Sequence, residues 1–163
     1  MRKILILLSC FCCFSLVSLG DEIQDVQCFF NQYIDAANSY SCDYFDFYCS
    51  NAKIIRVVEK PDGTQQAVNI PFDRYKSEVK KSSKLARLRN YKNKYFNVNI
   101  HPYGCDYKIV AMRMPSTSDY KIPAHFIIGK DNLGQWKIKE ESMNTKVQKF
   151  LKDGWFGWIF VFM

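Results

Sequence analysis

Three or four strand-like segments in the second half of the chain constrain its fold more than any other feature. Each is a short run rich in β-branched and aromatic residues, and the runs are Tyr95–His101, Tyr107–Met114, Tyr120–Ile128 and Trp136–Ser142. Turn-forming residues separate them at Gly104, at 115–119 and at 131–134. This alternation predicts successive β-strands joined by short turns.

Helical and strand-like patterns follow one another in the first half of the chain. Apolar residues from Ile23 to Ala37 recur every three or four positions, which predicts an amphipathic helix. Asp43 is expected to cap a short second helix, because aspartate accepts hydrogen bonds from the first turn. Residues 52–59 and 66–70 are predicted to form a hairpin closed by the turn at 60–64. Pro71 then suits the start of a third helix.

The order of these elements resembles the nuclear transport factor 2-like family. The similarity covers most of residues 22–146, and its local matches are Asn31-Gln32-Tyr33-Ile34-Asp35 and Asp131-Asn132-Leu133-Gly134-Gln135-Trp136-Lys137-Ile138. These segments are similar to the family's first-helix tyrosine and its D-x-x-G-x-W closing turn. The resemblance implies an α+β fold in which a curved antiparallel sheet wraps round about three helices to form a cone.

The first twenty residues have the pattern of a secretory signal peptide. Two basic residues precede an apolar run from Ile4 to Leu19, and the triplet Ser18-Leu19-Gly20 has small residues at the cleavage positions. The run is shorter than the roughly 20 residues that span a bilayer, so cleavage after Gly20 is favoured over a permanent anchor. A lipoprotein signal at Cys10 is a third alternative. The sequence therefore predicts export to the periplasm, the cell surface or the medium.

The pattern divides the chain into a signal peptide at 1–20, one domain at 21–146 and a basic, then aromatic, tail at 147–163. With 23 basic and 16 acidic residues, the formal net charge is +7, which favours anionic surroundings. At least one disulfide is expected after export, because exported cysteines usually pair. The candidates are Cys28, Cys42, Cys49 and Cys105, with Cys42 bound to either Cys28 or Cys49 as the local choices. No zinc-site spacing occurs, so neither a metal nor a cofactor is predicted.

The ketosteroid isomerase branch of the resembled family uses a helix tyrosine, a carboxylate base on the first strand and a second acid on a later strand. Tyr33 corresponds to the tyrosine, but the first strand offers Ile55, Arg56 and Val57 where the base is expected. The interior is therefore predicted to be aromatic and to lack a carboxylate within hydrogen-bond reach of Tyr33. The candidates for the pocket are Tyr33, Tyr44, Arg56, His125, Phe126 and Glu140. Of these, His125, Arg56 and Glu140 are hypothesised to meet at the mouth of the cone.

A dense group of basic residues and an apolar tail favour an anionic membrane surface as a partner. The candidate basic patch consists of Lys76, Lys80, Lys81, Lys84, Arg87 and Arg89. Residues 154–163 are almost wholly apolar and aromatic. A solvated helix and a tail that packs on its own domain are the alternative interpretations. Nucleic acid is disfavoured as a partner, because no recognised binding motif is present.

These features favour an exported, non-catalytic binding or interaction module. Its cone pocket is expected to hold a small apolar ligand or to meet a protein partner. An isomerase or hydrolase of the same fold is the first alternative. A membrane-associated component of a secretion assembly is the second, because cone domains behind an N-terminal hydrophobic segment also resemble type IV secretion subunits.

Overall fold

The computed structural model describes the backbone of residues 2–151 and the side chains of residues 20–151. The elements are α1 (Arg2–Ser39), the 3-10 helix η1 (Cys42–Phe47), β1 (Tyr48–Glu59), β2 (Gln65–Ile70), α2 (Phe72–Leu88), β3 (Asn93–Tyr103), β4 (Asp106–Pro115), β5 (Ile122–Lys130), β6 (Trp136–Thr145) and the 3-10 helix η2 (Gln148–Leu151). The predicted helices and strands are all present. The first helix begins at Arg2 instead of Ile23, and Ser41 instead of Asp43 caps η1.

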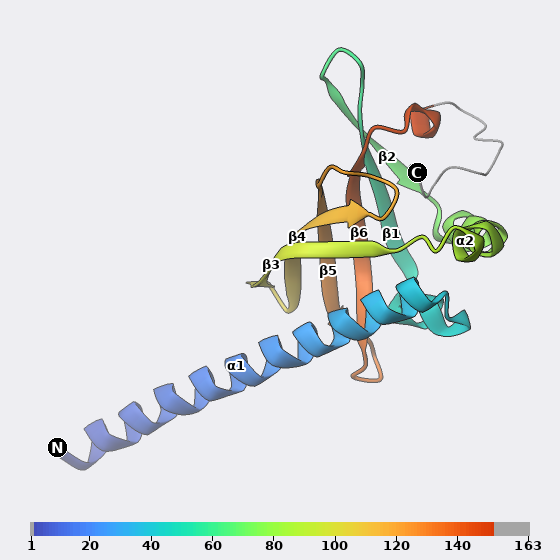
Figure 1. Ribbon diagram of the computed structural model, residues 1–163. Coiled ribbons are helices and arrows are strands. Elements are labelled where there is room, and N and C mark those ends of the chain that lie inside the picture. Colours follow the sequence, from blue (N-terminus) through green and yellow to red (C-terminus); the bar gives the residue numbers. More distant parts are fainter. Residues whose placement is uncertain (1, 152–163) are drawn as a thin grey trace.

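The six strands form one curved sheet in the order β2-β1-β6-β5-β4-β3. Four neighbouring pairs are antiparallel, whereas β1 and β6 run parallel. Figure 1 shows α1 and α2 beside the sheet, with α1 crossing it obliquely. The predicted α+β cone is therefore confirmed, with the correction that the sheet is mixed, because the first and last strands meet in its middle.

The C-terminal half of α1 lies against the sheet, while its N-terminal half extends beyond it (Figure 1). Glu22 connects α1 to strands β4 and β5 of the sheet. Tyr107 donates a hydrogen bond to Glu22 Oε2 at 2.8 Å, and Lys130 Nζ lies 2.9 Å from Glu22 Oε1. Among the described residues, no helix has the length and apolar character needed to cross a bilayer. Cleavage after Gly20 would cut within α1 and leave Glu22 in the folded domain.

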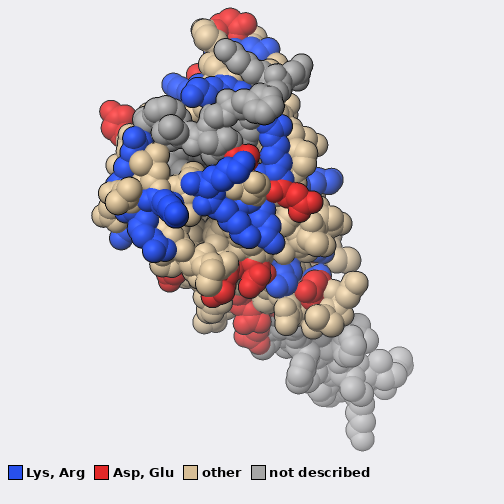
Figure 2. Space-filling model, turned by 90° about the vertical axis from the view of Figure 1, so that its right-hand side faces the viewer, with Lys and Arg blue, Asp and Glu red and all other residues tan. Residues whose placement is uncertain are grey.

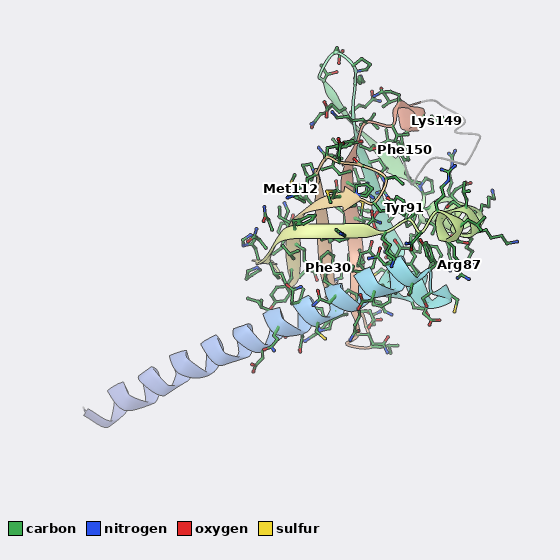
Figure 3. The ribbon with its side chains drawn as sticks, viewed as in Figure 1. Phe30, Arg87, Tyr91, Met112, Lys149 and Phe150 are labelled. Atoms are coloured by element: carbon green, nitrogen blue, oxygen red, sulfur yellow. The ribbon has the colours of Figure 1, made fainter. Side chains whose placement is uncertain are left out.

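Alternate residues of the strands face α1 and form the core. Phe30 of α1 and Phe126 of β5 are both completely buried, and their rings meet edge-on with centroids 5.0 Å apart. Tyr95 of β3 completes the cluster, with its ring centroid 5.4 Å from that of Phe30 and 6.0 Å from that of Phe126. Tilted aromatic contacts of this kind add to the stabilisation that comes from buried apolar area. Figure 3 shows Phe30 where α1 crosses the sheet.

A β-bulge in β6 determines which of its residues face inward. Adjacent residues of β5 pair with Ile138 and Glu140, so Lys139 is an extra residue in β6. One inserted residue reverses the alternation of side chains along a strand. Glu141 therefore faces the interior, where it is completely buried, and Glu140 faces the other side of the sheet.

Candidate functional site

A cavity of about 770 Å³ lies between the two long helices and the inner face of the sheet. Its wall is rich in aromatic rings, and the tyrosines in it are Tyr33, Tyr40, Tyr44, Tyr75, Tyr91 and Tyr95. The structure places three of the predicted pocket residues in this wall: Tyr33, Tyr44 and Arg56. Figure 3 shows three other wall residues, Arg87, Tyr91 and Phe150, on the side of the sheet where α2 and η2 lie.

Arg56 of β1 and Glu141 of β6 form a buried ion pair at the cavity wall. Arg56 Nη2 lies 2.7 Å from Glu141 Oε1, and the two side chains are 8% and 0% exposed. Burial alone would lower the pKa of Arg56, but the adjacent carboxylate more than offsets this effect and raises the pKa above its usual value. The guanidinium therefore stays charged. Removal of one partner from such a pair costs about 3–5 kcal/mol, because the other charge is left uncompensated.

Four tyrosines form a hydrogen-bonded network that begins at the second oxygen of Glu141. Tyr33 donates to Glu141 Oε2 at 3.2 Å, and Tyr48 donates to the same atom. Tyr44 OH lies 2.8 Å from the hydroxyls of both Tyr48 and Tyr75. The network therefore links α1, η1, β1 and α2 to the carboxylate on β6.

Burial raises the pKa of each phenol in this network. The pKa values of Tyr33 and Tyr48 lie well above their usual range because of burial first and the Glu141 carboxylate second. Burial also raises the pKa of Tyr44 well above its usual value, with Tyr75 and Glu141 adding to the effect. The pKa of Tyr75 rises to about 12. All four hydroxyls are therefore protonated at neutral pH and available as hydrogen-bond donors.

The prediction that no carboxylate lies within reach of Tyr33 is wrong, because β6 supplies Glu141. Strict alternation from Ile138 would place Glu140 inside, and the bulge at Lys139 places Glu141 there instead. Neither glycine nor proline marks this bulge. The signal in the sequence was the pair of adjacent acids within a strand-like segment, one of which must face the inner side of the sheet.

His125 and Glu140 lie on the outer face of the sheet, opposite to Arg56. They border a second hollow of about 530 Å³, together with Lys53 and Lys108. Burial and the positive charge of Lys108 lower the pKa of His125. The hypothesis that His125, Arg56 and Glu140 meet at the cone mouth is therefore wrong, because adjacent residues of a strand point to opposite faces.

Phe126 faces the interior, but its ring belongs to the core. It packs against Tyr33 with centroids 5.6 Å apart and against Phe30 at 5.0 Å. Phe126 is completely buried. The structure therefore places it behind the cavity wall, where it supports Tyr33.

The predicted basic patch lies along α2 and the residue that follows its end. Figure 2 shows Lys and Arg side chains gathered on the face of the molecule that carries α2. Within the described part of the chain, Lys81 is the one member of the patch that forms an ion pair, with Glu78 at 3.4 Å. Lys80 and Arg87 also belong to the cavity wall. The patch therefore borders the cavity as well as the exposed side of the helix.

The predicted disulfide is absent from the described residues: Cys28, Cys42, Cys49 and Cys105 are all free thiols. Two of these thiols form hydrogen bonds with nearby residues of the chain. Gln32 donates to Cys28 Sγ at 3.6 Å, and Cys42 Sγ donates to Asp43 Oδ1 at 3.3 Å. No group of three His, Cys, Asp or Glu side chains suited to a metal occurs in the described part. The aromatic tail at 154–163 and the predicted membrane role of Trp155, Phe156 and Trp158 lie outside the described residues.

Glu141→Gln is expected to lower the free energy of unfolding by about 3–5 kcal/mol, because Arg56 would keep a buried charge without a counter-ion. Glu140→Gln is the matched control, since it makes the same chemical change one residue away on the outer face. The control should cost less than about 0.5 kcal/mol. Urea denaturation followed by circular dichroism measures both. Equal losses in the two variants would contradict the assigned register of β6.

Stability is expected to fall as the pH rises above about 10, the usual pKa of tyrosine. The folded state retains the protons of Tyr33, Tyr44, Tyr48 and Tyr75, whereas the unfolded chain releases them. Because the unfolded state then binds fewer protons, the free energy of unfolding decreases from about pH 10 to beyond pH 12. Tyrosinate absorbance should therefore appear at higher pH in the folded protein than in urea. Coincident titration curves would show that the phenols are not buried.

No family model matches this sequence, and no characterised protein matches it by sequence alone. Solved structures do resemble it. A nuclear transport factor 2-like protein with a cystatin-like fold from Novosphingobium aromaticivorans has a TM-score of 0.57 and 8% identity, over 85% of this chain and 94% of its own. A nuclear transport factor 2-like protein from Cytophaga hutchinsonii has a TM-score of 0.52 and 10% identity, over 77% and 97% of the two chains.

A candidate ketosteroid isomerase from Shewanella frigidimarina is also similar, with a TM-score of 0.51 and 13% identity over 71% of this chain and 90% of its own. At these identities the likeness concerns the fold. The chain therefore has the nuclear transport factor 2-like fold, as its element order predicted.

Proposed function

We propose that this protein is an exported, non-catalytic binding module whose cone cavity holds a small, largely apolar ligand. The cavity itself carries the proposal: its volume of about 770 Å³ lies within the roughly 300–1,000 Å³ of typical small-molecule sites. Tyrosine rings dominate its wall, and a few polar groups converge on it. The signal-peptide pattern at 1–20 supports the expectation of export.

The contact between Tyr33 and Glu141 favours one second candidate, an isomerase-like enzyme, because a phenol beside a carboxylate suits proton transfer. The arrangement of Glu141 argues against it. A general base needs an oxygen that can accept the substrate's proton, whereas here Oε1 already binds Arg56 and Oε2 already accepts from Tyr33 and Tyr48. Both oxygens of the Glu141 carboxylate are therefore occupied by donors from the protein. Its geometry supports a structural anchor.

Ala36→Trp is expected to weaken the binding of the neutral fluorescent probe N-phenyl-naphthylamine at least about tenfold, because the indole would fill part of the cavity. This probe brightens in apolar surroundings, so its fluorescence gives the dissociation constant. Ala67→Trp on the exposed side of β2 is the matched control and should bind the probe as the wild type does. A wild-type protein that does not bind the probe, or equal binding by both variants, would overturn the cavity as a ligand site.

The charge on α2 favours an additional role at an anionic phospholipid surface. Lys76, Lys80 and Lys84 recur every four residues, so they share one side of the helix. Lysine ammonium groups attract anionic headgroups by about 1 kcal/mol each near the surface, an attraction that salt screens. Figure 2 shows that basic side chains gather on this face.

The double change Lys80→Gln and Lys84→Gln is expected to reduce binding to vesicles that contain phosphatidylglycerol severalfold at low salt. The double change Lys53→Gln and Lys94→Gln is the control. It removes the same number of positive charges, but from exposed residues outside α2. Sedimentation with anionic and with neutral vesicles measures the bound fraction. If both pairs of changes have the same effect, net charge accounts for binding and α2 is not the contact surface.

A further inference from the structure

Among the described residues, four cationic side chains line the cavity, but only one carboxylate does. The cations are Arg56, Lys80, Arg87 and Arg113, and the carboxylate is Glu141. Glu141 compensates Arg56, which lies 2.7 Å away. Within residues 20–151, no ion pair includes Arg113. The described part of the cavity wall therefore carries an excess of positive charge that its one acid does not balance.

Arg113, like Arg56, lies on a strand, so the sheet fixes its position in the cavity wall. It lies on β4 directly opposite Tyr95 of β3, so both side chains are on the inner face. Its Nη1 approaches Asn93 Oδ1 at 3.4 Å, a long contact to an oxygen that also accepts from Tyr91 OH at 3.0 Å. Its Nε is shielded from solvent and has no hydrogen-bond partner among the described residues.

An incompletely bonded guanidinium in a shielded site is costly unless something supplies the missing acceptors. Tyr91, Tyr95 and Arg113 line the same cavity. Burial raises the pKa of both phenols, and the charge of Arg113 opposes this rise, together with a side-chain interaction between Arg113 and Tyr91. Neither neutral phenol compensates the charge. A bound anion would balance this charge, because Arg113 lines the cavity and a guanidinium suits a carboxylate or sulfonate.

We infer that the cavity is built for an organic anion, with an apolar aromatic or aliphatic body among the tyrosines and an acidic group bound to Arg113. This inference rests on the proposed function, since it assigns the ligand class of the same cavity. The exposed Lys80 and Arg87 at the wall extend the positive charge towards solvent. Charge of one sign along an entrance raises the local concentration of oppositely charged ligands.

Two dyes with nearly the same rings test the ligand class: the anion anilinonaphthalene sulfonate and the uncharged N-phenyl-naphthylamine. The wild type should bind the sulfonate at least about tenfold more tightly, as expected for a charge-assisted hydrogen bond. Arg113→Gln should abolish this preference and leave the affinity for the neutral dye within about twofold. Arg113→Lys, which keeps the charge without the fork, should retain part of the preference.

Lys94→Gln is the control, because it removes one positive charge from an exposed residue outside both the cavity wall and α2. It should leave the preference for the sulfonate unchanged, and circular dichroism verifies that each variant is folded. If both dyes bind and Arg113→Gln keeps the preference, the inference fails and the proposed function stands. If neither dye binds to the wild type, both fail. If Arg113→Gln does not fold, the test uses wild type and Arg113→Lys. The inference is then overturned if each of these two proteins binds the sulfonate and the neutral dye with equal affinity.

Discussion

The buried ion pair between Arg56 and Glu141 is the interaction on which the rest of the structure depends. It joins β1 and β6, the parallel pair that brings the first and last strands together in the middle of the sheet. Charges inside a protein destabilise it unless further hydrogen bonds satisfy them. Tyr33 and Tyr48 supply these bonds, so α1 and the start of β1 must both be in place before the pair is fully compensated.

The ion pair between Arg56 and Glu141 can form in only one register of β6. A shift of β6 by one residue would move Glu141 to the outer face of the sheet. Glu140 or Ser142 would then face the interior in its place. Arg56 would then have no acceptor for its buried charge. The bulge at Lys139 avoids this outcome, because it keeps Ile138 in the core and still directs Glu141 towards Arg56. The buried ion pair therefore adds to the register specificity that the apolar pattern of the strand already provides.

Much of the fold could be predicted from the sequence, because turn residues mark the strand ends and apolar periodicity marks the helices. The direction of Arg113 was also readable, since it continues the inward alternation of Tyr107, Ile109 and Ala111. What could not be predicted is which of the two adjacent acids, Glu140 or Glu141, faces inward, because neither glycine nor proline marks the bulge before them. The cavity could not be predicted from the sequence either, since it depends on how α1 and α2 pack over the sheet.

The two inward arginines divide the cavity into ends with different physical properties. At Arg56 the charge is neutralised and the donors and acceptors satisfy one another, so a ligand there would have to break hydrogen bonds that already exist. At Arg113 the hydrogen bonding is incomplete, so a ligand with an acidic group would add bonds without breaking any of comparable strength. The hydrogen-bonded network around Glu141 then has a second effect: it fixes the wall against which the apolar body of the proposed ligand would pack. Binding of the proposed anion at one end of the cavity would thus depend on the structural polar cluster at the other.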